Sequence, residues 1–112
     1  AAKAAADARQ QQALASDEKS VLQAFADAES ASAGQRAAND ALDAVIRAAA
    51  LASEAESLAS KLYQQGLTDY LALLDAQRQL ALLEDAEIES RNQALQAAAR
   101  LYKSLGGSWQ PE

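Results

Sequence analysis

The chemistry open to this chain is limited, because its 112 residues include no histidine and no cysteine. Nucleophilic catalysis would then need a serine with a lysine as its base, and a thiolate metal site is excluded. Lys19 and Ser20 are adjacent, but they lie in a stretch predicted to be an exposed helix, which offers no oxyanion site. We therefore predict that the protein is not an enzyme and binds no cofactor.

Three carboxylates, Glu84, Glu87 and Glu89, are spaced closely enough to suggest a metal site on a helix. The helical di-metal motif, however, pairs its glutamates with a histidine three residues further on, and the sequence contains none. We interpret this cluster as a solvated helix face. A second charged pair, Asp75 and Arg78, has the i, i+3 spacing of a local helical ion pair, which contributes only a few tenths of a kcal/mol.

The charge distribution also excludes several partners. The net charge is −6 and no basic cluster interrupts it, so we expect no nucleic-acid binding. No apolar run reaches the roughly 18 to 20 residues that span a bilayer. Alanine-rich faces insert shallowly into lipid and the net charge is repelled by anionic headgroups, so we expect no direct membrane insertion by this segment.

The elements that carry these residues are predicted to be helices. Alanine and leucine dominate the sequence, aromatic residues make up 4%, and the only proline is Pro111. Apolar residues recur at steps of three and four on both sides of Gly66. The sequence therefore predicts an all-α protein, a single helical domain over residues 1–112. We expect a long antiparallel hairpin of coiled-coil type, with helices over about residues 5–64 and 68–105.

An alternative is a three-helix bundle with a break near Ser30 to Gly34, where serine and glycine weaken the helix. If the first helix is continuous, it is roughly 90 Å long against roughly 55 Å for the second. Its first twenty or so residues then have no partner within the chain. The same pattern makes Phe25 the largest apolar anchor of the N-terminal region.

The predicted turn, residues 63–70, surrounds the only glycine between Gly34 and Gly106. Gly66 allows a tight reversal, and either Thr68 or Asp69 can cap the helix that follows. We expect Tyr63 to cover the last hydrophobic layer, formed by Leu62 and Leu67. At the other end, Gly106, Gly107 and Pro111 are predicted to stop the second helix, with Trp109 as a packing plug.

Two motifs in this sequence resemble those of the outer-membrane efflux proteins, the TolC-like outer-membrane factors. The first is Tyr63-x-x-Gly66-x-x-x-Tyr70-Leu71-x-x-Leu74-Asp75-Ala76-Gln77-Arg78, and the second is Leu101-Tyr102-Lys103-x-Leu105-Gly106-Gly107-x-Trp109. Upstream, Val21-Leu22-x-Ala24-Phe25-x-Asp27-x-Glu29 is similar to the segment that opens the last long periplasmic helix of that family. The resemblance extends from about Ala8 to the end of the chain.

The resemblance implies a function in transport. Members of the family are trimers with an outer-membrane barrel and a helical tunnel across the periplasm. Their hairpin tips close the tunnel entrance and meet a periplasmic membrane-fusion adaptor of an inner-membrane pump. By this resemblance the gate and adaptor tip comprises Tyr63, Gly66, Leu67, Thr68, Asp69, Leu71, Asp75 and Arg78. Leu71, Asp75 and Arg78 match the entrance constriction, where a ring of three carboxylates would act as an electrostatic gate.

Two functions follow for this chain. In the first, it is the periplasmic hairpin of an outer-membrane channel in a Gram-negative bacterium. Its tip gates a tripartite efflux duct and docks the adaptor, and its copies self-associate as a trimer in the parent protein. Because the sequence carries no barrel strands and no first repeat, we expect it to be the periplasmic part of a longer protein. In the second, it is a structural helical scaffold with no transport activity of its own.

Overall fold

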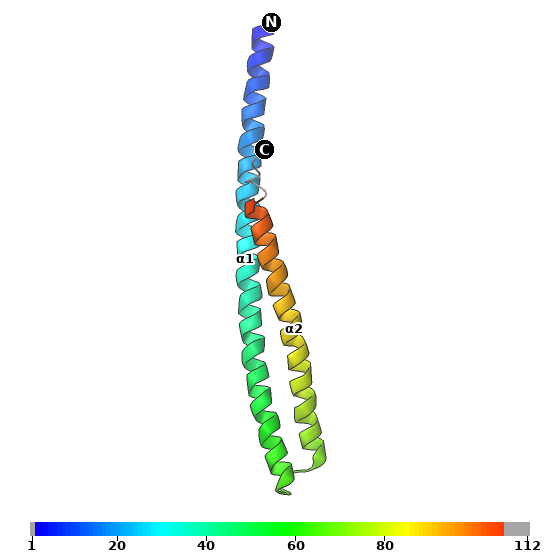
Figure 1. Ribbon diagram of the computed structural model, residues 1–112. Coiled ribbons are helices and arrows are strands. Elements are labelled where there is room, and N and C mark those ends of the chain that lie inside the picture. The colour runs from blue at the N-terminus through cyan, green and yellow to red at the C-terminus, as the bar shows by residue number, and fades with distance from the viewer. Residues whose placement is uncertain (1, 107–112) are drawn as a thin grey trace.

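Two long helices joined by a short turn form the part of the chain that the structure, a computed structural model, describes, residues 2–106. Helix α1 spans Ala2–Gln64 and has 63 residues, and helix α2 spans Tyr70–Gly106 and has 37. They run antiparallel, side by side, over the whole length of α2 (Figure 1). The molecule measures 96 × 23 × 14 Å. The predicted all-α hairpin is confirmed, with helix ends within about three residues of those expected.

Helix α1 is continuous through Ser30 to Gly34, so the alternative of a three-helix bundle is wrong. One glycine within a helix costs about 1 kcal/mol relative to alanine, and the long alanine-rich stretches on both sides offset that cost. Gly34 is itself exposed and lines an open groove between the helices together with Gln93, Ala97 and Arg100. Ala31 and Gln35 on either side of it are half-buried, so packing supports α1 on both sides of this weak point.

The helices meet along a seam of residues that are buried or half-buried at alternating steps of three and four. This spacing is the seven-residue repeat of a coiled coil. On α1 the seam consists of Ala28, Ala31, Gln35, Ala38, Leu42, Val45, Ala49, Ala52, Glu56 and Ala59. On α2 it consists of Leu73, Ala76, Leu80, Leu83, Glu87, Ser90, Ala94, Ala97, Leu101 and Ser104.

The core along this seam is thin, because most of its side chains are small. Only Ala49, Leu73 and Ala97 are buried among the residues described, and each keeps 7% to 8% of its surface exposed. Several larger apolar residues lie outside the seam, including Leu82 and Ile88, which are 58% and 68% exposed. Glu87 and Ser90 occupy the seam at this height of α2 instead. Alanine allows the helices to approach closely, and dispersion contacts then replace part of the missing apolar area.

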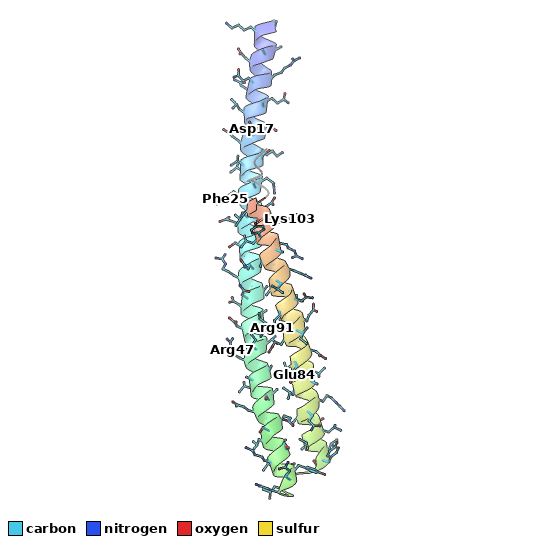
Figure 2. The ribbon with its side chains drawn as sticks, in the orientation of Figure 1. Asp17, Phe25, Arg47, Glu84, Arg91 and Lys103 are labelled. Atoms are coloured by element: carbon cyan, nitrogen blue, oxygen red, sulfur yellow. The ribbon has the colours of Figure 1, made fainter. Side chains whose placement is uncertain are left out.

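The N-terminal part of α1 extends beyond the end of α2 (Figure 1). Leu14, Val21 and Leu22 are all more than half exposed there, and Phe25, predicted as an anchor, is 64% exposed. Phe25 lies at about the height of Lys103, in the last turn of α2, where the paired region ends (Figure 2). The predicted overhang of α1 is confirmed. The expected roles of Gly107, Trp109 and Pro111 fall outside the described residues.

Candidate functional site

The end of α1 is closed by backbone hydrogen bonds around Gly66. The Leu67 amide donates to the Leu62 carbonyl at 2.8 Å, and the Gly66 amide donates to the Tyr63 carbonyl at 3.0 Å. This pair of bonds is the Schellman motif, which requires a left-handed residue just beyond the helix. Gly66 supplies it, with φ of 73°. The predicted use of Gly66 to reverse the chain is confirmed.

The start of α2 is capped by Asp69 rather than Thr68. The Ala72 amide donates to Asp69 Oδ1 at 3.0 Å, which satisfies one of the free N–H groups of the first turn. A carboxylate at this position also interacts favourably with the positive end of the helix dipole. Thr68 is half-buried in the turn. The two caps together hold residues 65–69 in one compact reversal.

The two tyrosines at the ends of the turn contact each other. The Tyr63 and Tyr70 rings have centroids 5.6 Å apart and planes at 62°, an edge-to-face arrangement. Sequence analysis placed Tyr63 over Leu62 and Leu67, but Leu67 is 70% exposed and the partner of Tyr63 is Tyr70. The two tyrosines at the first and last positions of the predicted turn, residues 63–70, were the available signal for this contact. The ring pair bridges the helix ends, while Leu67 projects into solvent.

The three residues predicted for the entrance constriction share one face of α2. Leu71, Asp75 and Arg78 follow each other at steps of four and three, on the side of the helix opposite the seam. All three are exposed, Leu71 by 65%. They rise over about 10 Å from the turn. The chain therefore presents an apolar side chain, a carboxylate and a guanidinium away from α1, where another molecule has access to them.

The predicted local ion pair between Asp75 and Arg78 is not formed. Across residues 2–106 the only ion pair joins Arg91 Nη2 to Glu87 Oε2, at 3.2 Å. Glu87 therefore has a cation as its partner, while Glu84 and Glu89 are exposed. Asp75 and Arg78 keep their charges available to a partner. This arrangement differs from that of a stabilising pair, whose charges would neutralise each other.

The remaining candidate for chemistry, the Lys19–Ser20 dipeptide, has no catalytic geometry. The Ser20 hydroxyl donates to the Ser16 carbonyl at 2.9 Å, the bond that a serine commonly makes within a helix. Both residues are exposed on the overhang of α1. The site with the most distinctive geometry is therefore the turn and the first two turns of α2. It can bind a partner through shape, exposed apolar groups and charge.

The described chain is a capped helical hairpin with an exposed tip. Residues 1–107 match the family model for outer membrane efflux proteins. The chain belongs to the outer membrane efflux protein family. This match confirms the family that the two sequence motifs indicated. Members of the family are transport proteins.

Among curated proteins, the chain is similar to the pyoverdine export outer membrane protein OpmQ of Pseudomonas aeruginosa, with 37% identity over 94% of the chain. It is also similar to outer membrane protein OprJ of the same species, with 37% identity over 93% of the chain. The cation efflux system protein CusC of Escherichia coli O157:H7 has 32% identity over 94%. The chain spans only 22% to 23% of the length of these relatives.

No solved structure matches the chain significantly. Within residues 2–106, neither helix contains a stretch long and apolar enough to cross a membrane.

Proposed function

We propose that this chain is the periplasmic hairpin of an outer-membrane efflux channel, and that its turn docks a periplasmic adaptor. The observation that carries the proposal is the tip itself: Leu67, Tyr70 and Leu71 are 56% to 70% exposed around a turn held by two helix caps. Exposed apolar side chains on a rigid turn cost little entropy to order on binding. The resemblance to TolC-like outer-membrane factors implies the kind of partner, a periplasmic adaptor of an inner-membrane pump, and membership of the efflux family supports it.

The same proposal assigns gating to the face of α2 opposite the seam, which carries Leu71, Asp75 and Arg78. In a trimeric parent, three copies of Asp75 would approach a common axis, where like charges repel and can hold a cation. Asp75 is exposed and has no ion-pair partner within the described chain, so its charge is available for such a ring. Leu71 lies one turn nearer the tip and would narrow the same passage. Arg78 would pair with a neighbouring copy or with the adaptor.

Docking is tested by measuring binding of the chain to the hairpin end of its cognate adaptor with isothermal titration calorimetry. Gly66→Pro removes the left-handed residue of the cap, since proline fixes φ near −65°, and should abolish binding. Asp75→Ala should keep the fold, because Asp75 is exposed and forms no ion pair within the described residues, and should weaken binding about threefold to tenfold.

A substitution far from the tip is the matched control. Leu95→Ala removes a 70% exposed leucine of the same helix and should leave the adaptor affinity unchanged. Equal loss of binding in Leu95→Ala and in the tip variants would contradict docking through the tip. Absence of binding by the unsubstituted chain would leave the structural scaffold as its function.

A further inference from the structure

The face of α1 that packs against α2 continues beyond the end of α2. Extending the seam spacing toward the N-terminus gives Ala24, Val21, Asp17 and Leu14. Leu22 and Phe25 flank this line on one side. The apolar members Leu14, Val21, Leu22 and Phe25 are 59% to 68% exposed, and no part of the described chain covers them. We call these four residues the overhang patch.

The overhang patch lies where α1 has no partner helix (Figure 1). A helix without a partner is marginal in water, because packing of its apolar face supplies most of the stability of a helix in a protein. Leu14, Val21 and Leu22 line an open hollow together with Asp17 and Glu18. Neither carboxylate has an ion-pair partner within the described chain. The side chain that suits this hollow therefore combines a large apolar surface with a hydrogen-bond donor.

The chain leaves α2 beside this patch. Lys103 lies at about the height of Phe25 (Figure 2), and α2 ends three residues further on, at Gly106. Three helical residues rise about 4.5 Å, which brings Gly106 to about the height of Leu22. Trp109 follows after three more residues, over which an extended chain spans about 10 Å. A side chain at position 109 can thus reach the heights between Leu22 and Asp17.

We propose that Trp109 packs on the overhang patch of its own chain, so that the segment 107–112 continues the cover that α2 gives to α1. The occupant is this segment because it starts beside the patch and carries the only tryptophan of the sequence. The proposal goes beyond the general role of a packing plug, since it names the surface that the indole covers. It is independent of docking by the tip.

Tryptophan has both properties that suit the hollow. Its ring system buries up to about 250 Å², more than any other side chain can offer to Val21 and Leu22. Its indole N–H donates a hydrogen bond and accepts none, so a carboxylate is a suitable partner. Asp17 and Glu18 supply two carboxylates at the hollow. A purely apolar side chain at position 109 would leave both of them unused.

The tryptophan of the same chain has an advantage over any second copy that competes for the patch. A short tether gives a bound group an effective concentration in the millimolar range. Trp109 is three residues from the end of α2, and this end lies at the height of the patch. At micromolar chain concentrations the intramolecular contact therefore forms first. The surroundings of Trp109 are then the same at every such concentration.

This contact ties the hairpin at both ends. The turn and its two caps join the helices at one end. At the other end, α2 cannot separate from α1 without exposing the indole ring together with Val21 and Leu22. Because the seam between the helices buries few large side chains, a contact at its open end has a large effect on the pairing of α1 with α2.

Tryptophan fluorescence tests the contact directly, because Trp109 is the only tryptophan. We expect the unsubstituted chain to emit at a shorter wavelength than an indole in water. Val21→Gln puts a polar side chain into the patch, and it should shift the emission to longer wavelength and raise the acrylamide quenching constant about twofold. Leu51→Gln is the matched control, since Leu51 is 66% exposed against 68% for Val21 and lies further along α1. It should leave the emission unchanged.

Three results would overturn the proposal. The first is the emission of a solvated indole in the unsubstituted chain, and the second is an equal effect of Val21→Gln and Leu51→Gln. The third is an emission spectrum that changes with chain concentration, which would assign the patch to a second copy.

Hydrogen exchange gives an independent measurement. Trp109→Ala uncovers the patch, so amide exchange should become about threefold to tenfold faster over residues 14–25 and stay unchanged over residues 55–64, next to the turn. Unchanged exchange over residues 14–25 would also contradict the contact. Adaptor binding is measured separately, so failure of this proposal leaves the docking proposal intact, and the reverse holds.

Discussion

At the scale of single residues, Gly66 and Asp69 determine the geometry of the tip. Gly66 provides the left-handed conformation at the end of α1, and Asp69 accepts the Ala72 amide at the start of α2. These two caps lie within four residues of each other, so neither helix can lengthen without breaking one of them. The exposed Leu67 between them is held in place by backbone bonds rather than by burial.

Substitution of Gly66 should reveal this backbone requirement. A Cβ at this position meets no atom within 4 Å, so the cost of Gly66→Ala comes from the positive φ and not from a clash. We expect Gly66→Ala to lower the free energy of unfolding by about 1 kcal/mol, and Gly66→Asn by less, because asparagine tolerates this conformation better. Urea unfolding followed by circular dichroism measures both. A cost for asparagine equal to or above that for alanine would contradict the role of φ.

The residue-level predictions from sequence succeeded where the signal was local. Gly66 as the reversing residue depends on its own backbone freedom, and a helix cap at position 68 or 69 depends on nearby N–H groups. The Tyr63–Tyr70 contact and the missing Asp75–Arg78 pair were not predicted. Both depend on side-chain orientation across several residues, which spacing alone does not determine. The gate and docking roles of the eight tip residues stay predictions.

At the scale of elements, α1 stays helical through a segment of low helix propensity, with helix-favouring sequence on both sides of it and α2 alongside (Figure 1). Ser30 to Gly34 contains poor helix formers, yet α1 runs straight through them. The sequence could not decide between a break and a continuous helix, because a glycine costs about as much as a few neighbouring alanines contribute. Ala31 and Gln35, on either side of Gly34, are half-buried, and the α2 residues at the same height, Gln93, Ala97 and Arg100, lie some 60 residues further along the chain.

Replacement of Gly34 by alanine should therefore stabilise the hairpin. The position has helical backbone and open space, with no atom within 4 Å of an added Cβ. Alanine removes the entropic penalty of glycine, so we expect the free energy of unfolding to rise by about 0.5 to 1 kcal/mol. Thermal and urea unfolding measure the change. A loss of stability would indicate that the helix bends or breaks at Gly34 in solution.

The residues that form the seam between α1 and α2 are only partly predictable from the sequence. Apolar residues at steps of three and four indicate an amphipathic face on each helix, and Leu42, Val45 and Leu73 do lie in the seam. The same spacing does not distinguish two apolar faces on one helix: Leu82 and Ile88 are exposed, while Glu87 occupies the seam. A helix with one partner needs one stripe, and these helices carry two. The exposed apolar face of each helix can be distinguished from the buried one only after the seam has been located in the structure.

At the scale of the whole molecule, the hairpin has the form of one segment of a larger assembly. It is 96 Å long and 14 Å thick in its smallest dimension, and it leaves 15 large hydrophobic side chains exposed among the residues described. Monomeric soluble proteins rarely expose so much apolar surface in ordered stripes. Lateral partners along the shaft and an adaptor at the tip would cover different parts of this surface.

Under the proposed function, the tip binds the adaptor and the shaft takes no part in that contact. Titration of isotopically labelled chain with the hairpin end of the adaptor, followed by amide chemical shifts, tests this most directly. We expect shifts confined to about residues 62–78, with Gly66, Leu67 and Asp69 among the largest. Shifts centred on the middle of α1 and α2, or no shifts at saturating adaptor, would contradict it.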